Sequence, residues 1–348
     1  GLFCNAAVSP GNGSGLLIAD NDLDESGANS IRLVGIYVQG AEGATVSGNT
    51  VSNISNTLAE AIRGIWFATG TVTGTITGNT VSNLTKTVTS ADAAITGIYI
   101  TPGTAAKEIS ITANTISNLT NTGTLATFAG IRNLVPNVTI TGNTITTLTQ
   151  NTNAASIWGI VSSGASRVEV SGNDVSDIST ATTGTPNGIS IQGNSTTVQV
   201  FNNRISNIKN TNTGGYSAVG LALASTSTVA DLLVYNNFIR DVAGYGSSST
   251  TTDNGYGIRI TSGGGYRLYH NSVHLATGQT ATTGIPACLM IANALPDDAL
   301  DIRNNIFSMA ATVGTNRCAV ICNSANTVFS AIDYNDYYKS GGHIGYIG

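Results

Sequence analysis

One asparagine recurs about every thirty residues along most of this chain, inside copies of a motif that alternates β-branched and polar residues. The clearest copies read TVSGNTVSNIS from residue 45, TITGNTVSNLT from 75, SITANTISNLT from 110 and TITGNTITTLT from 139. When all copies are aligned, the central residues form one column: Asn49, Asn79, Asn114, Asn143, Asn173, Asn203, Asn237, Asn271, Asn305 and Asn335. A repeat of this length is one structural unit that buries its apolar face by stacking on its neighbours. The chain is therefore predicted to be a solenoid.

A second motif with the same period precedes each next copy: GIYV at 35, GIWF at 64, GIYI at 97, GIRN at 130, GIVS at 159, GISI at 188, GLAL at 220 and GIRI at 257. Alternating β-branched residues are typical of short strands with one buried face, and helical spacing is absent. Two or three strands per period, with Gly and Asn turns, match one coil of a parallel β-helix, whose strands pair between coils at about 4.8 Å. We predict an all-β fold, a right-handed parallel β-helix (solenoid) of about ten coils.

The asparagine column has a structural interpretation. An asparagine at the bend between two strands tolerates the left-handed αL conformation, and its side-chain amide can bond the amide one coil away. The glycines of the SGN, TGN and GI motifs are expected to need positive φ or a close backbone approach. We expect residues 1–30 to form an N-terminal segment or cap, 31–340 the parallel β-helix, and 341–348 the start of a following segment.

Composition excludes some partners. Charged residues make up 9% of the chain, with 14 Lys plus Arg and a net charge of −5. No basic stripe is available for phosphates or anionic lipids, so nucleic-acid binding is not expected. No apolar run is long enough to span a membrane, and direct membrane insertion is not expected. The first residues lack the basic head and apolar stretch of a signal peptide, which suggests a mature or excised segment.

The coil pattern, [IV]-x-[IV]-x-x-N-x-[IV]-x-N, resembles the repeats of the pectate-lyase-like superfamily from Val34 to about Tyr338. The closing AIDYNDYYKSGGHIGYIG is similar to the ends of β-helix segments in secreted or surface proteins of gliding-type bacteria. The first resemblance implies a right-handed parallel β-helix, and the second implies an extracellular or cell-surface location. The superfamily contains polysaccharide lyases, glycoside hydrolases, adhesins and structural spikes, so the fold does not choose among them.

A search of the aligned columns for stacked carboxylates with a basic partner assigns no catalytic residue. Asp174 and Arg204 become neighbours on successive coils. Together with five further residues they form a charged cluster that we interpret as a surface ion-pair ladder rather than an active site; the five are Glu169, Asp177, Lys209, Arg240 and Asp241. The three histidines, His270, His274 and His343, lack the spacing of a metal site.

An aromatic strip is the candidate ligand-binding site. Alternation turns Ile36, Ile65 and Ile98 inward, so the intervening residues must face outward on three consecutive coils. These residues are Tyr37, Trp66 and Tyr99. Exposed aromatic rings can stack on sugars or pack against another protein. The alternative is that residues 1–30 fold back and cover the strip.

The stretch from Asp20 to Gly27 is the densest acidic segment. Carboxylates at Asp20, Asp22 and Asp24 can converge on a hard cation when a loop curls, which makes them a candidate Ca²⁺ site. The match is partial, because the glycine expected directly after the third aspartate is displaced to Gly27. A solvated acidic loop is the other interpretation, and no other cofactor is expected.

Four cysteines occur, Cys4, Cys288, Cys318 and Cys322. Cys288 and Cys318 fall near equivalent points of successive repeats, which allows a disulfide in an oxidising compartment. Buried free thiols are the equally weighted alternative.

The sequence favours a non-enzymatic, extracellular or cell-surface β-helix that acts as an adhesive or structural stalk, a filament module that binds glycans or other surface proteins. Unpaired strands at both ends predict end-to-end self-association. A carbohydrate-active enzyme, either a polysaccharide lyase or a glycoside hydrolase, is the leading alternative on the same fold. Ice binding is a minor one, suggested by outward hydroxyl pairs such as Thr45 with Ser47 and Thr75 with Thr77 on successive coils.

Overall fold

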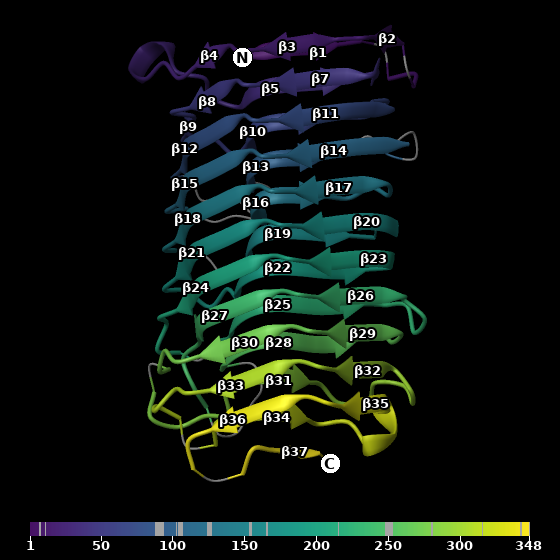
Figure 1. Ribbon diagram of the computed structural model, residues 1–348. Helices are drawn as coiled ribbons and strands as arrows, with labels where there is room; N and C mark the ends of the chain where they lie inside the picture. The colour runs from purple at the N-terminus through teal and green to yellow at the C-terminus, as the bar shows by residue number, and fades with distance from the viewer. Residues whose placement is uncertain are drawn as a thin grey trace.

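The computed structural model describes residues 1–347 except 7, 11, 88–93, 102, 104–106, 124–126, 153–154, 165, 215, 248–252, 280, 315 and 342. The chain winds as stacked coils from the N-terminus at one end to the C-terminus at the other (Figure 1). Each complete coil contributes one strand to each of three long sheets, and all the strands pair in parallel with their counterparts on neighbouring coils. The predicted parallel β-helix is confirmed.

Sheet 1 has twelve strands: β1 (Leu2–Asn5), β5 (Val34–Gln39), β10 (Ile62–Phe67), β13 (Ala94–Ile100), β16 (Thr127–Asn133), β19 (Ile157–Ser163), β22 (Pro186–Gly193), β25 (Ala218–Ser225), β28 (Gly255–Ser262), β31 (Ala287–Ile291), β34 (Cys318–Cys322) and β37 (Gly345–Ile347). Sheet 2 has eleven: β3 (Leu17–Ala19), β7 (Ala44–Ser47), β11 (Thr73–Thr77), β14 (Glu108–Thr112), β17 (Val138–Thr141), β20 (Ser166–Ser171), β23 (Thr196–Phe201), β26 (Leu232–Tyr235), β29 (Tyr266–Tyr269), β32 (Leu300–Arg303) and β35 (Phe329–Asp333).

Sheet 3 has twelve strands: β4 (Asp22–Leu23), β8 (Thr50–Ser52), β9 (Ser55–Asn56), β12 (Thr80–Lys86), β15 (Thr115–Asn121), β18 (Thr144–Gln150), β21 (Asp174–Thr180), β24 (Arg204–Asn210), β27 (Phe238–Ala243), β30 (Ser272–Leu275), β33 (Ile306–Met309) and β36 (Asp336–Lys339). Outside these sheets, β2 (Gly13–Ser14) pairs with β6 (Ala41–Glu42). Two single 3₁₀ turns complete the described elements, η1 (Gly27–Asn29) and η3 (Asn326–Val328). None of the described helices is long and apolar enough to cross a membrane.

The core follows from the period-two alternation. Ile36, Ile65, Ile98 and Ile131 occupy one register position of sheet 1, and all four are fully buried. Burying an isoleucine side chain contributes about 2 kcal/mol, and the same aliphatic column continues along the rod. Because the inward residues are nearly uniform, the outward residues are free to vary from coil to coil.

The asparagine column forms a continuous buried ladder at the bend between sheets 2 and 3. In each step the backbone N–H and Nδ2 of one asparagine donate to Oδ1 of the next, at 2.8 to 3.2 Å. Asn21 heads the ladder, one coil before the first residue of the predicted column. The expectation that the ladder asparagine itself adopts αL is wrong. The residue before it has positive φ, for example Gly78 at 63° and Asn202 at 56°.

The glycines of the GI motifs allow a close backbone approach, as predicted. A Cβ built on Gly64 would lie 2.3 Å from Val81 Cγ1 and 2.6 Å from the carbonyl oxygen of Gly97. Gly97 and Gly130 have the same surroundings one and two coils further on. At these positions of sheet 1 only the hydrogen atom of a glycine fits against the neighbouring atoms.

Strand pairing extends beyond residues 31–340. Residues 2–5 pair with β5, residues 17–19 with β7 and residues 22–23 with β8. At the other end, β37 pairs with β34. The boundaries predicted at residues 30 and 340 therefore do not coincide with a break in the sheets.

Candidate functional site

The predicted aromatic strip lies on the outer face of sheet 1. Tyr37, Trp66 and Tyr99 are register partners on β5, β10 and β13, and all three are partly exposed. The ring centroids of Tyr37 and Trp66 lie 4.9 Å apart in an edge-on arrangement. Those of Trp66 and Tyr99 lie 5.9 Å apart and are stacked. The parallel register thus brings together three rings that are about thirty residues apart in sequence.

Phe3 adds a fourth ring that the sequence analysis did not identify. It pairs with Tyr37 in the β1 to β5 register, and the two ring centroids are 5.8 Å apart. Phe3 is 61% exposed. Residues 2–5 therefore do not cover the strip, because β1 continues sheet 1 and lengthens it. The signal in the sequence was the run Leu2-Phe3-Cys4, which repeats the in-out-in alternation of the later strands.

Two arginines lie against these rings. Arg63 Cζ is 4.0 Å from the Trp66 ring centroid and 5.0 Å from that of Tyr99. Arg132, the next residue in the aromatic column, has its Cζ 5.2 Å from the Tyr99 centroid. The rings and guanidinium groups therefore form one continuous row of contacts, which we call the aromatic-arginine strip.

The strip carries two positively charged side chains, Arg63 and Arg132. Burial lowers the pKa of Arg63, and the positive charge of Arg132 lowers it further, while Tyr99 and Tyr37 act in the opposite direction. Among the described residues neither arginine forms an ion pair with a carboxylate. Arg63 Nε is buried and has no hydrogen-bond partner among the described residues. The strip therefore combines apolar ring faces with cationic edges that no carboxylate in the described part of the chain neutralises.

The hydrogen bonds of the strip hold its rings in place. Trp66 Nε1 donates to Thr101 Oγ1 at 2.6 Å, and the Tyr37 hydroxyl donates to Gln39 Oε1. Burial raises the pKa of Tyr37, so its hydroxyl stays protonated at neutral pH. Beyond Arg132 the column continues with Val161 and Ser190, which end the aromatic face.

The acidic segment does not form the curled loop that the Ca²⁺ prediction requires. Asp22 lies in the extended strand β4, and Asp20 occupies the positive-φ position before ladder residue Asn21. The Asp24 carbonyl oxygen accepts a hydrogen bond from Asn53 Nδ2 at 2.5 Å. Among the described residues no group of three or more His, Cys, Asp or Glu side chains converges as a metal site. The coil geometry thus separates Asp20, Asp22 and Asp24 along the backbone.

The disulfide considered between Cys288 and Cys318 is not formed, and all four cysteines are free. Cys318 is the register partner of Ala287, so Cys288 is shifted by one position. A shift of one residue turns a strand side chain to the opposite face. Cys288 accordingly packs in the main core, whereas Cys318 joins a small outer cluster with Tyr256 and Met290. Burial raises the pKa of both thiols.

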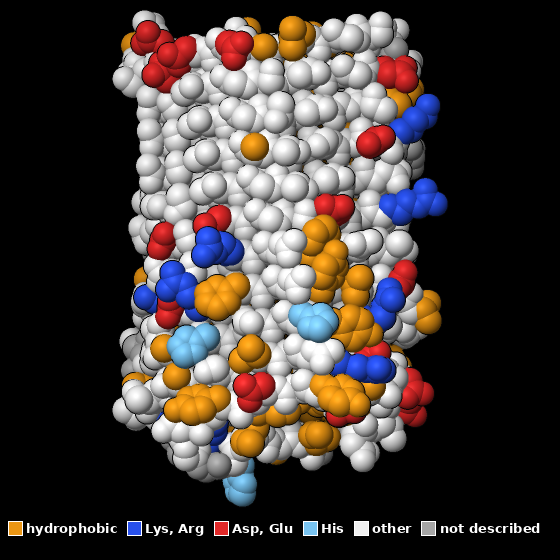
Figure 2. Space-filling view, in the orientation of Figure 1, with side chains coloured by type: hydrophobic (Ala, Val, Ile, Leu, Met, Phe, Trp, Pro, Cys, Tyr) orange, Lys and Arg blue, Asp and Glu red, His pale blue; other side chains and the backbone are white. Residues whose placement is uncertain are grey.

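Sheet 2 presents a hydroxyl face in its N-terminal half. Thr45, Thr75, Ser110 and Thr139 form one register row, and Ser47, Thr77, Thr112 and Thr141 form the next. Figure 2 shows this part of the surface almost free of charged and apolar side chains, which gather toward the C-terminal end. Glu169, Gln199 and Leu233 continue the first row without a hydroxyl group, and ice binding stays a prediction.

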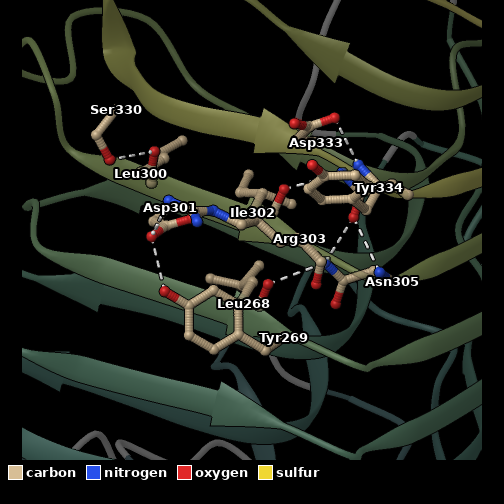
Figure 3. Close-up of polar contacts among 11 residues, drawn as sticks. Leu268, Tyr269, Leu300, Asp301, Ile302, Arg303, Asn305, Ser330, Asp333 and Tyr334 are labelled. Atoms are coloured by element: carbon tan, nitrogen blue, oxygen red, sulfur yellow. Dashed lines mark hydrogen bonds and ion pairs between the residues drawn. The ribbon is translucent and has the colours of Figure 1, made fainter.

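The C-terminal half of sheet 2 has stacked rings and a polar network instead. The centroids of the Phe201 and Tyr235 rings are 4.7 Å apart, and the two rings are stacked and nearly parallel, with an interplanar angle of 7°. One coil further, the Tyr269 hydroxyl donates to Asp301 Oδ2 at 2.7 Å, and Arg303 binds both oxygens of the same carboxylate at 2.7 and 3.1 Å (Figure 3). Asp301 is thus saturated by its neighbours and serves to fix the surface of β32.

The histidines do not gather. His270 occupies the positive-φ position before ladder residue Asn271, and His274 Nδ1 lies 3.0 Å from Ser308 Oγ on the outer face of sheet 3.

Comparison with known proteins agrees with this geometry. The family model for the right-handed β-helix region matches residues 34–273. Neither the search of curated proteins nor that of solved structures finds a match. The similarity of the last residues to surface proteins of gliding-type bacteria lies outside the matched range and stays a prediction. Since the match covers more than half of the chain, and the strands stack in parallel coils as the family requires, this chain belongs to the right-handed β-helix family.

Proposed function

We propose that this chain is a non-enzymatic, extracellular or cell-surface β-helix that acts as a stiff stalk and binds glycans or another surface protein through the aromatic-arginine strip. One observation carries the proposal: four outward aromatic rings follow one another in register on sheet 1. Nothing in the coil requires them, because the inward partners Ile36, Ile65 and Ile98 already fill the core.

The chemistry of the strip suits a sugar chain. Pyranose rings have apolar C–H faces that stack on aromatic rings, and their hydroxyls accept hydrogen bonds from guanidinium groups. Rings spaced by one coil offer several such contacts along one line. A linear glycan can therefore bind along the rod axis, across β1, β5, β10 and β13.

The stalk role is supported by the asparagine ladder. It runs without interruption from Asn21 to Asn335, and the buried members satisfy one another's polar groups. A fully satisfied buried network makes the backbone of each coil depend on the next, which favours a stiff rod.

The test is binding to a panel of neutral and acidic polysaccharides by affinity gel electrophoresis, with Trp66→Ala as the variant. We expect retention by at least one polysaccharide of the panel to be at least tenfold weaker than for the unmodified protein. Tyr338→Ala is the matched control, since Tyr338 is an exposed aromatic residue on sheet 3, 54% exposed and away from the strip. The control should bind as the unmodified protein does.

Two results would refute the proposal. Loss of several degrees of melting temperature in Trp66→Ala, with binding intact, would make Trp66 a packing residue. New reducing ends or unsaturated uronate absorbance after incubation with the panel would instead identify a carbohydrate-active enzyme.

A further inference from the structure

A groove of about 560 Å³ crosses the outer face of sheet 3, over β21, β24 and β27. It lies on a different sheet from the aromatic-arginine strip. Its size is within the range of small-molecule binding sites. Asp174, Arg204 and Phe238 form one register row of its lining, and Asp177 and Asp241 border it where the strands bend.

The groove coincides with a departure from the repeat. On the four preceding coils the row that contains Asp174 is uniformly threonine: Thr50, Thr80, Thr115 and Thr144. It then changes to an acid, a base and an aromatic ring on three successive coils. The inward residues of these coils, such as Val175, Ile205 and Ile239, remain fully buried aliphatics. Core packing therefore does not account for the change, which is confined to the exposed surface.

Some of the charged side chains in the groove are held by neighbours. The carboxylate of Asp177 accepts hydrogen bonds from Asn207, from Ser176 at 3.0 Å and from Thr146 at 3.1 Å. The hydrogen bond from Asn207 is the largest cause of its lowered pKa. Asp241 pairs with Arg240 at 2.8 Å and accepts a hydrogen bond from Thr277 at 3.0 Å. These contacts fix the walls of the groove.

Asp174 and Arg204 differ from these walls. They are register neighbours and both are exposed, yet the described residues give them neither an ion pair nor a side-chain hydrogen bond. The ion-pair ladder predicted here is thus reduced to the single pair of Arg240 with Asp241. Beside Arg204, Phe238 is 41% exposed and presents an apolar surface to the same groove.

We infer that this groove is a second binding site, for a short segment of a neutral oligosaccharide. The lining contains three carboxylates, Asp174, Asp177 and Asp241, against two guanidinium groups, Arg204 and Arg240, which disfavours an anionic ligand. A pyranose ring offers an apolar face for Phe238 and hydroxyls that donate to Asp174 and accept from Arg204. Such a site on sheet 3 lets one rod hold a neutral chain independently of whatever occupies the strip on sheet 1.

The experiment is affinity electrophoresis of the full chain in gels containing hydroxyethylcellulose, xylan, glucomannan or polygalacturonate, followed by calorimetry with the hexasaccharide of the retaining polymer. Phe238→Ala and Arg204→Ala are each expected to raise the Kd for a neutral hexasaccharide at least tenfold. Thr80→Ala is the matched control, because Thr80 is exposed in the same register row outside the groove. Circular dichroism melts of all variants verify that the coils remain folded.

The outcomes separate this site from the strip. Neutral retention that survives Trp66→Ala but is lost in Phe238→Ala and Arg204→Ala supports the groove. Retention by polygalacturonate alone, neutral retention lost only in Trp66→Ala, or no neutral retention at all overturns it.

Discussion

The side-chain amide of Asn143 donates a hydrogen bond to Asn173 Oδ1 at 2.9 Å, and both asparagines are 1% exposed. Asn143 Oδ1 in turn accepts from the backbone N–H and Nδ2 of Asn114, at 3.0 and 2.9 Å. Its Nδ2 also donates to the carbonyl oxygen of Ile111 at 2.9 Å. One side chain therefore satisfies polar groups on the coil before its own and on the coil after it.

Asn143→Ala should lower the free energy of unfolding by about 3 kcal/mol, because it leaves the Asn114 N–H and the Ile111 carbonyl oxygen buried without these partners. Urea or thermal unfolding measures the effect. Thr144→Ala, at the adjacent exposed position, should change stability by less than about 0.5 kcal/mol. Equal effects of the two substitutions would show that the ladder contributes little.

The glycine of a GI motif and the glycine of a TGN motif should respond differently to substitution. A Cβ on Gly130 would lie 2.6 Å from Ile145 Cγ2 and 2.7 Å from the Gly159 carbonyl oxygen, so Gly130→Ala should cost about 3 kcal/mol. Gly142 has φ of 66° but open space around its Cβ. Gly142→Asn should cost no more than about 1 kcal/mol, since asparagine tolerates this conformation, as Asn202 shows. If unfolding curves show that Gly142→Asn is the less stable of the two variants, this interpretation of the glycine positions is wrong.

Alkaline pH should destabilise the rod through Tyr266. Its hydroxyl donates to the Ser262 carbonyl oxygen at 2.7 Å and accepts from the Ser225 N–H at 3.0 Å, and burial raises its pKa to about 12. A pKa that is higher in the folded state gives stability that is complete below pH 10, the unfolded value, and is lost as pH rises toward 12. A difference of about two units between the folded and unfolded pKa corresponds to about 3 kcal/mol in the free energy of unfolding.

Thermal unfolding between pH 8 and 12 checks this, with Tyr266→Phe as the comparison. The variant should be less stable at pH 8, because the Ser225 N–H loses its acceptor. The difference in stability between the two proteins should shrink above pH 10. There the hydroxyl of Tyr266 ionises on unfolding, which favours the unfolded state of the unmodified protein and not that of the variant. Parallel stability curves for the two proteins would show that Tyr266 does not titrate as its burial indicates.

The thiols should differ in reactivity. Cys4 is partly exposed, while Cys288 and Cys322 are fully buried, and burial raises the pKa of both buried thiols. Since the thiolate is the reactive form, a thiol reagent should modify Cys4 first and the others only after unfolding. Mass spectrometry of the purified chain counts the modified sites. A native disulfide that peptide mapping assigns to Cys288 and Cys318 would contradict their opposed orientation.

The sequence predicted the features that repeat. Inward isoleucines, the asparagine column and the outward position of Tyr37, Trp66 and Tyr99 all follow from a period of two within strands and a common coil register. The αL position was misplaced by one residue, because the same bend accepts Gly78, Asn202 and several other residue types.

The features that do not repeat escaped prediction. Arg63 lies three positions before Trp66 on the same strand. Its guanidinium group contacts Tyr99 only because the side chain extends toward the next coil. Cys318 was aligned with Cys288 by approximate period, although a single-residue offset decides which face of sheet 1 it occupies. The groove near Arg204 was not predicted, because the sequence does not show which charged side chains pair with a neighbour. That pairing depends on three-dimensional contacts.

The isolated chain of residues 1–348 should associate end to end. The first coil presents an open apolar hollow of about 460 Å³, lined in part by Leu2, Leu16 and Ile18, and its strands pair on one side only. A charged side chain pointing into the end of a sheet blocks further pairing, so Leu2→Lys should remove concentration-dependent growth in light scattering. Leu58→Lys adds the same charge at an apolar residue that is 54% exposed and does not line the hollow, and it should leave association intact. A strictly monomeric unmodified chain at all concentrations would contradict the prediction, and equal loss in both variants would attribute association to charge rather than to the open coil.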